Sequence, residues 1–199
     1  AFEVVEELCW NAPDHFVIPA AGGTLSSRVH KGLNELEIVG LAETAGVKIN
    51  IAQAGGCDPI ATAILEGGEI EPQTPDTAAH SLAIGAPGDG PLVVDAVRTR
   101  GGSAATPTDP EIWEAIDLLG ATEGILTEPA GGTTIATVGQ LAAQGKIGPD
   151  ETVVAIISGN GLKTIQDHPD KAWPEMVACN LEAMGAQLDD FRRTAATVA

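Results

Sequence analysis

Three glycine-rich loops carry the groups of this sequence that could best bind a ligand. The first loop reads Ala20-Ala21-Gly22-Gly23-Thr24-Leu25 and leads from a short apolar run into a helical pattern. Glycine lets the backbone come close to a ligand, and a helix start offers unpaired N–H groups and the positive end of its dipole. The loop could therefore bind an anion, such as a phosphate. A tight turn that needs glycine only for packing is the alternative, because the loop matches neither the P-loop pattern nor Gly-x-Gly-x-x-Gly.

The other two loops each come after an extended segment, and each begins with a polar residue. Glu128 stands directly before Pro129-Ala130-Gly131-Gly132-Thr133, where its carboxylate could either interact with a helix dipole or face a pocket. Ser158 opens Ser158-Gly159-Asn160-Gly161, where its hydroxyl could contact a ligand or the loop could simply turn the chain. In open parallel sheets, ligands bind where the carboxyl ends of the strands meet the adjoining loops. All three loops are therefore candidates for a binding site.

Two reactive side chains have no neighbour in the sequence that would activate them. Cys57 follows Gly55-Gly56, but no base is spaced to make it a nucleophile, and an unpaired cysteine often acts as a small buried hydrophobic residue. Lys163 would need a desolvated amine to form a Schiff base, and it stands in a loop that we expect to be open to solvent. The four histidines and three cysteines lack metal-ligand spacing, so no metal site is predicted.

Helical and strand patterns alternate along the chain, and these elements must position the loops. Apolar runs predict strands at residues 15–18, 47–53 and 152–157, with an edge strand at 102–106. Helices are predicted at residues 2–9, 24–39, 59–65, 92–100, 108–119 and from 131 or 133 to 144, the fifth capped by Thr108 or Asp109. Continuous apolar strands that alternate with helices predict an α/β fold of three layers, a mostly parallel twisted sheet with helices on both faces.

Composition excludes several classes of partner. The chain has 199 residues, and 10 Lys and Arg against 28 Asp and Glu give it a net charge of −18. Such an acidic surface repels nucleic-acid backbones and anionic membranes. Aromatic residues make up only 3% of the chain, and no apolar run reaches the roughly 20 residues of a membrane-spanning helix. The few cysteines, without Cys-x-x-Cys, suggest a cytoplasmic protein in a reducing environment.

Taken together, ordered segments from residue 1 to about residue 165 resemble one family, the pyridoxal-phosphate-dependent threonine synthases. These enzymes belong to fold type II, the class of the tryptophan synthase β subunit. The matching segments include Ala1-Phe2-Glu3-Val4-Val5-Glu6-Glu7-Leu8, Ile18-Pro19, His30-Lys31-Gly32, Gln53-Ala54-Gly55-Gly56-Cys57-Asp58-Pro59-Ile60, Ser81-Leu82-Ala83-Ile84-Gly85, Asp89-Gly90-Pro91, Glu123-Gly124-Ile125-Leu126-Thr127-Glu128 and Ser158-Gly159-Asn160-Gly161-Leu162-Lys163-Thr164. No single segment is decisive, but the ordered set is specific.

The resemblance implies a cofactor, pyridoxal 5'-phosphate (PLP), and a role for each loop. Residues Ala20, Ala21, Gly22, Gly23, Thr24 and Leu25 would bind the cofactor phosphate through backbone N–H groups. Ser158 would hydrogen-bond the pyridine nitrogen, and Glu128 and Gly159 would line the cofactor pocket. The implied reaction converts an amino-acid substrate, O-phospho-L-homoserine, and water to L-threonine and phosphate, in an enzyme that forms a homodimer.

The resemblance also places this chain as the C-terminal part of such an enzyme. Residues 1–166 would belong to the catalytic domain, and residues 167–199 would form a peripheral tail. The Schiff-base lysine is expected in the missing N-terminal part, so we expect the chain alone to be inactive. The lysines that do not match it are Lys31, Lys48, Lys146, Lys163 and Lys171.

Three alternatives remain open at the level of the sequence. The first is a related PLP enzyme, such as a serine or threonine dehydratase or a sulfhydrylase. The second is a non-catalytic α/β module that binds phosphate. The third, a nucleotide-binding α/β domain, lacks the expected glycine fingerprint and ranks last.

Overall fold

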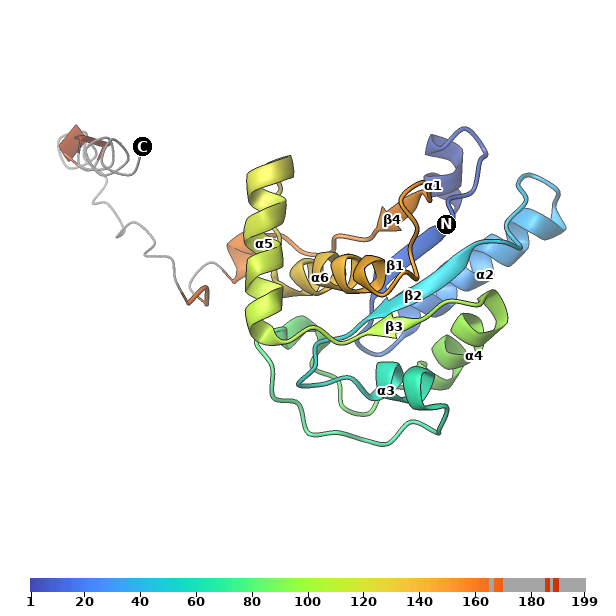
Figure 1. The fold of residues 1–199 in the computed structure, drawn as a ribbon, viewed down its shortest axis with the longest axis horizontal. Helices are drawn as coiled ribbons and strands as arrows, with labels where there is room; N and C mark the ends of the chain where they lie inside the picture. The colour runs from blue at the N-terminus through green and yellow to red at the C-terminus, as the bar shows by residue number, and fades with distance from the viewer. Residues whose placement is uncertain (165–166, 170–184, 187, 190–199) are drawn as a thin grey trace. The chain divides into compact units, whose positions relative to one another are not determined.

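Four parallel strands form the central sheet of the protein (Figure 1). The structure is a computed structural model that describes residues 1–164, 167–169, 185–186 and 188–189. The strands follow the spatial order β3-β2-β1-β4. Their bounds are His15–Pro19 for β1, Lys48–Ala52 for β2, Ala104–Ala105 for β3 and Val153–Ala155 for β4. All four strand predictions are confirmed in position, although β3 and β4 are shorter than the sequence suggests.

Six α-helices connect and cover these strands within the compact unit Ala1–Thr164. Their bounds are Phe2–Glu7 for α1, Thr24–Ile38 for α2, Pro59–Glu66 for α3, Gly90–Arg100 for α4, Asp109–Glu123 for α5 and Pro129–Ala143 for α6. Two short 3-10 turns, η1 (His80–Leu82) and η2 (Gly161–Lys163), lie in the loops. Thr108 is the N-cap of α5, as one of the two predicted alternatives.

Most of the predicted tail, residues 167–199, lies outside the described residues. None of the helices that the structure describes has the length and apolar character needed to cross a bilayer.

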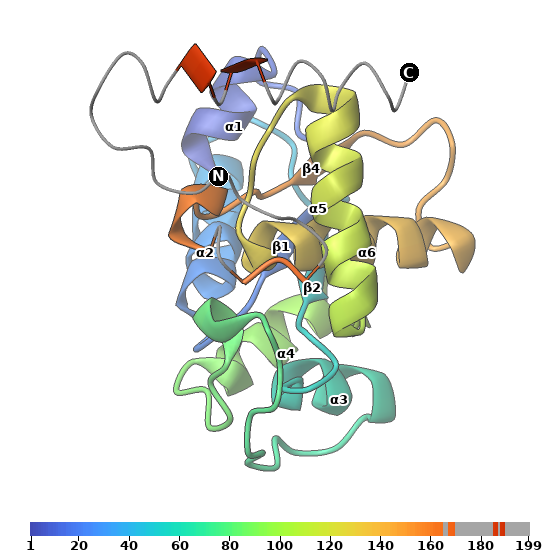
Figure 2. The same cartoon turned by 90° about the vertical axis from the view of Figure 1, so that its left-hand side faces the viewer.

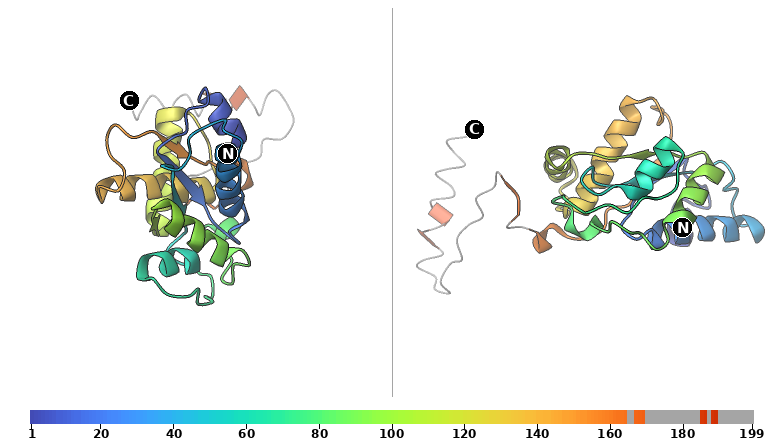
Figure 3. Two further views of the ribbon diagram at one scale, coloured as in Figure 1. Left: turned by 90° about the vertical axis from the view of Figure 1, so that its right-hand side faces the viewer. Right: turned by 90° about the horizontal axis from the view of Figure 1, so that it is seen from below.

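Helices cover both faces of the sheet, which confirms the predicted α/β class (Figures 1 and 3). Alternate strand residues point to opposite faces. Phe16, Ile18 and Ile51 therefore pack in one core cluster with apolar side chains of α2 and α4. Val17 and Ala52 face the other way, in a cluster with Leu141 of α6. Figure 2 shows α3 beside α4, and α5 packs against α6 rather than on the sheet.

The strand β4 ends earlier than predicted because the chain turns to meet another segment. Ile156 lies just beyond the end of β4, and its N–H still donates to Val17 O of β1 at 3.0 Å. Beyond it, Asn160 pairs with Thr127 in an isolated antiparallel bridge. The backbone cannot remain in register with β1 and also reach Thr127. The predicted strand at 152–157 therefore becomes a short strand followed by a loop.

A cluster of polar side chains lies at the amino-terminal edge of the sheet, where the strands begin. His15 is buried, and its Nε2 lies 3.1 Å from a carboxylate oxygen of Glu151. Asn50 donates to His15 Nδ1 at 3.0 Å, and Lys48 Nζ donates to Glu151 at 3.0 Å. Gly148 N–H also donates to the Glu151 carboxylate, at 2.6 Å. The hydrogen bonds that Glu151 makes with Gly148 N–H, Lys48 and His15, in decreasing order of effect, lower its pKa to about 2.

The low pKa of Glu151 predicts how stability depends on pH. A carboxylate whose pKa is lower in the folded state stabilises the fold above its unfolded pKa, and this contribution is lost as pH falls toward the folded value. We expect Glu151→Gln to lower the urea midpoint at pH 7. Between pH 4.5 and 2, this variant should lose less stability than the unmodified protein. Urea titrations at several pH values measure this. If stability changed with pH in the same way in both proteins, the Glu151 carboxylate would not contribute to stability.

Candidate functional site

Two of the three predicted loops follow adjacent strands and begin at the same, carboxyl edge of the sheet. The strands β1 and β4 are parallel neighbours, with His15 opposite Val153 and Val17 opposite Ala155. The loop of residues 20–25 follows β1, and the segment that contains Ser158 follows β4. Both segments therefore leave the sheet at its carboxyl edge. This is the edge at which parallel sheets bind ligands.

The first loop ends at the start of α2 in a conformation that favours glycine. Gly23 is the N-cap of α2 and has a φ of +95°. A Cβ at this position would lie only 2.8 Å from Val93 Cγ2. Thr24 is exposed, and its hydroxyl donates to Asp89 Oδ2 at 2.8 Å, while Asp89 N–H donates to Gly22 O at 2.9 Å. The loop is thus held against the start of α4 by its own backbone and one side chain.

One buried hydroxyl at this helix start lacks a partner. Ser26 in the first turn of α2 is fully buried, and its Oγ finds no hydrogen-bond partner in the part of the chain that the structure describes. Side chains in a helix tilt toward its N-terminus, so this hydroxyl is directed back toward the loop. The first N–H groups of a helix have no partner inside the helix. Together with the glycine backbone, these groups fit an anion such as a phosphate.

Glu128 directs its carboxylate away from the adjoining helix. It is the N-cap of α6, but its side chain makes no capping hydrogen bond. Instead, Ser81 Oγ donates to Glu128 Oε2 at 3.0 Å, and Lys163 Nζ lies 2.8 Å from the same oxygen. The Glu128 side chain is only 5% exposed. Glu128 therefore does not cap α6 through its side chain, and its role in a pocket stays a prediction.

The loop after β4 packs directly over Glu128. Gly159 has a φ of +77°, and a Cβ there would overlap Glu128 Oε1. Thr127 Oγ1 donates to Gly159 O at 3.3 Å. The half-buried Ser158 precedes this contact, so the structure brings Ser158, Gly159 and Glu128 together.

Gln53 organises the loop after β2, a role that its sequence context does not indicate. The side chain is fully buried. Its Nε2 donates to Ala20 O at 3.1 Å, and its Oε1 accepts from the N–H groups of Ile60 and Ala61, both at 2.9 Å. One side chain therefore links the end of β1 to the start of α3. No local pattern indicates the role of Ser81 either, because its contact with Glu128 spans 47 residues.

Cys57 is a buried core residue. Its side chain has no exposed surface, and burial, with the nearby charge of Asp58, raises its pKa. A raised pKa opposes the thiolate that a nucleophile needs. The expectation that Cys57 is structural therefore fits its surroundings.

Within the described ranges, no group of three or more His, Cys, Asp or Glu side chains could hold a metal ion.

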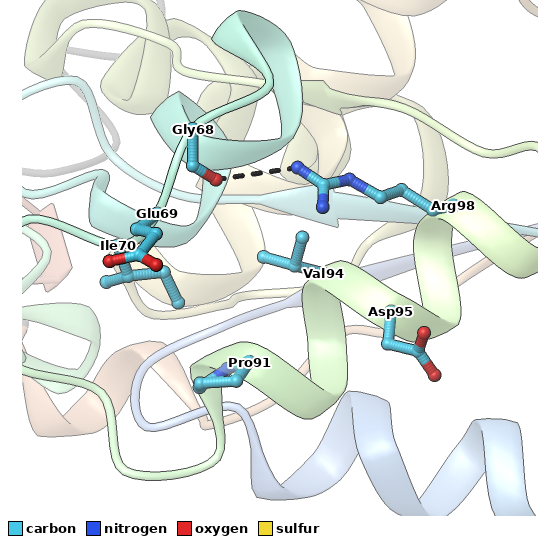
Figure 4. Close-up of a pocket in the computed structure, with 7 residues that line it drawn as sticks. All are labelled: Gly68, Glu69, Ile70, Pro91, Val94, Asp95 and Arg98. Atoms are coloured by element: carbon cyan, nitrogen blue, oxygen red, sulfur yellow. Dashed lines mark hydrogen bonds between the residues drawn. The ribbon is translucent and has the colours of Figure 1, made fainter.

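A cleft of about 390 Å³ lies between the segment after α3 and the helix α4 (Figure 4). It is lined by Gly68, Glu69, Ile70, Pro91, Val94, Asp95 and Arg98. Figure 4 shows the guanidinium of Arg98 extending toward Gly68 O, to which it donates at 3.5 Å, while Asp95 points away from the other lining residues. None of the residues predicted to bind a ligand lines this cleft.

Sequence comparisons relate the chain to known proteins. A family model described as "Pyridoxal-phosphate dependent enzyme" matches residues 1–159. The chain is 38% identical over 165 residues to the threonine synthase of Methanocaldococcus jannaschii, and the match covers 82% of the chain and 40% of that protein. It is 35% identical over 186 residues to the threonine synthase of Methanosarcina acetivorans, with 92% and 46% covered. The chain spans less than half the length of these two relatives.

Solved structures share the fold at lower identity. Maize serine racemase matches with a TM-score of 0.62 and 23% identity, over 83% of this chain and 48% of its own. The processed form of threonine deaminase isoform 2 from Solanum lycopersicum matches with a TM-score of 0.63 and 20% identity, over 85% and 48%. At these identities the likeness establishes the fold alone.

Proposed function

Because the chain belongs to the family of pyridoxal-phosphate-dependent enzymes, we propose that it is the C-terminal part of a threonine synthase. The whole enzyme would convert O-phospho-L-homoserine and water to L-threonine and phosphate. The observation that carries this proposal is the identity of 38% and 35% to two threonine synthases, over most of the chain. The homodimer and the cytoplasmic location stay predictions.

The residues at the carboxyl edge fit the cofactor. The N–H groups of the loop, residues Ala20 to Leu25, would hold its phosphate, and the unpartnered hydroxyl of Ser26 supports an anion there. The hydroxyl of Ser158 would donate to an unprotonated pyridine nitrogen, and Glu128 and Gly159 would line the pocket. When bound, the cofactor supplies an electron sink for carbanion chemistry. These residues would orient it, and the loops would exclude water from one side.

The proposed reaction also needs a Schiff-base lysine, and the described lysines have other partners. Lys31, Lys48, Lys146 and Lys163 interact with Glu35, Glu151, the Ser103 hydroxyl and Glu128, respectively. Lys171 lies outside the described residues. We propose that the Schiff-base lysine belongs to a part of the full-length enzyme outside this chain, because none of these five lysines matches the lysine of the family.

Reductive labelling tests that placement. We expect no single lysine of this chain to be labelled stoichiometrically after incubation with PLP and borohydride, because none matches the Schiff-base lysine. Mass spectrometry of the digested protein measures the label on each lysine. Stoichiometric label on Lys163, the described lysine at the candidate site, would overturn the placement.

The reaction itself is tested with the full-length protein. We expect it to release phosphate from O-phospho-L-homoserine and to form L-threonine in equal amounts. Assays with L-serine and L-threonine as substrates serve as the comparison, since a dehydratase converts these to keto acids. Rapid keto-acid formation without any L-threonine synthesis would replace the proposal with the dehydratase alternative.

A further inference from the structure

The buried carboxylate of Glu128 is held by two segments that are far apart in the sequence. Ser81 in η1 donates to it at 3.0 Å, and Lys163 in η2 makes an ion pair with it at 2.8 Å. The Glu128 side chain is 5% exposed, whereas that of Lys163 is 59% exposed. The ion pair therefore has one end inside the protein and one end at its surface.

Because its partner carboxylate is buried, we expect Lys163 to contribute more to stability than a lysine in an exposed ion pair. Exposed ion pairs contribute little to stability, because water screens both charges. A buried carboxylate is different, because removing its partner leaves an uncompensated charge that costs much more. The ammonium of Lys163 is thus the group that neutralises the Glu128 charge within the described contacts of this carboxylate.

The same ion pair closes the loop that begins at Ser158. Gly159 lies against Glu128 Oε1, with no room for a Cβ. Asn160 pairs with Thr127, and Gly161 N–H donates to Leu126 O at 3.1 Å. Lys163 then returns to Glu128 from the far end of the loop. Residues 158–163 are therefore fastened to residues 126–128 along their length, and Lys163 supplies the charged contact.

We propose that Lys163 is a positioning residue of the cofactor site: it neutralises Glu128 and fixes the loop of residues 158–163, so that Ser158 meets the pyridine nitrogen. This inference rests on the proposed function. It adds a role for Lys163 that the sequence does not suggest, since a lysine in an open loop is expected only to be solvated.

Binding of pyridoxine 5'-phosphate to the full-length protein, freed of PLP, tests the proposal without any enzymatic turnover. This compound has the cofactor's phosphate and ring nitrogen but no aldehyde, so it needs no lysine to bind. Ligand fluorescence gives its dissociation constant. We expect Lys163→Met to weaken binding at least about tenfold, the equivalent of about 1.4 kcal/mol. Lys163→Arg keeps the charge and should bind within about threefold of the unmodified protein, a difference of less than about 0.7 kcal/mol.

A double variant separates charge neutralisation from a simple packing effect. In Glu128→Gln with Lys163→Met, no uncompensated charge remains, so this variant should bind more tightly than Lys163→Met alone. The matched control is Lys31→Met, because Lys31 makes an exposed ion pair with Glu35 on α2. This control should leave the dissociation constant unchanged.

The ring nitrogen of the bound ligand provides a spectroscopic signature. An unneutralised carboxylate beside Ser158 favours the protonated nitrogen, so Lys163→Met should raise the pKa of the bound ring, by about one unit. Absorbance titration of the complex measures it. Unchanged affinity and unchanged ring pKa in Lys163→Met would overturn the role of Lys163 while leaving the cofactor site intact. Failure of the unmodified full-length protein to bind pyridoxine 5'-phosphate would instead overturn the cofactor site, and the inference with it.

Discussion

Replacing Gly23 by alanine is expected to weaken the binding of pyridoxine 5'-phosphate at least about tenfold, or about 1.4 kcal/mol. Gly23 has a φ of +95°, which costs a residue with a Cβ about 1–2 kcal/mol. The new Cβ would also meet Val93 Cγ2 at 2.8 Å and the backbone of Asp89 at 3.1 Å. The loop must shift to relieve these contacts, and its N–H groups would then no longer converge on the phosphate. A fluorescence titration measures the loss of affinity.

Gly40→Ala is the matched control for the effect of backbone strain. Gly40 follows the other end of α2 with a φ of +70°, and a Cβ there meets nothing within 4 Å. We expect this variant to lose a similar amount of stability from its backbone conformation but to bind the ligand normally. Equal affinities for Gly23→Ala and Gly40→Ala would mean that the loop of residues 20–25 does not bind the phosphate.

Replacing Gln53 by alanine is expected to lower the free energy of unfolding by about 3–5 kcal/mol. The substitution removes one donor and one acceptor that together satisfy Ala20 O and the N–H groups of Ile60 and Ala61. Gln53 is fully buried, so water cannot readily replace these partners. Each buried group left without a partner costs about 1–3 kcal/mol. Urea unfolding measures the change.

Gln53→Glu separates the two halves of this side chain. A carboxylate still accepts from the N–H groups at the start of α3, where the helix dipole favours negative charge. It no longer donates to Ala20 O, so we expect a loss of stability that is smaller than in Gln53→Ala. If Gln53→Ala lost less than about 1 kcal/mol, the link between β1 and α3 would be unimportant for stability.

The order of elements could be predicted from the sequence because local patterns are strong in this chain. The strand at residues 15–18 is apolar on both faces, as a strand between two helical layers must be. The start of α5 is marked by Thr108 and by Glu111, whose carboxylate accepts from Thr108 N–H at 2.7 Å. That hydrogen bond is the largest cause of the lowered pKa of Glu111. Both signals act within a few residues, so they are visible without the fold.

The partners of the site residues could not be predicted, because they depend on distant contacts. Glu128 at a helix start suits a dipole as well as a pocket, and its contacts with Ser81 and Lys163 come from distant parts of the chain. The same holds for Gln53, whose partner Ala20 lies 33 residues away. Strand order was also beyond the sequence patterns. The adjacency of β1 and β4, which starts the two loops at the same edge, follows from the fold.

The central claim is that the carboxyl edge formed by the loop of residues 20–25 and by Ser158 binds the cofactor. Amide NMR of the labelled chain during titration with pyridoxine 5'-phosphate tests it most directly. The account predicts saturable shifts at Gly22, Gly23 and Thr24 and at Ser158 and Gly159. Amides of the cleft beside α4, such as those of Glu69 and Arg98, should not move. Shifts confined to that cleft, or none at the edge at saturating ligand, would contradict the account.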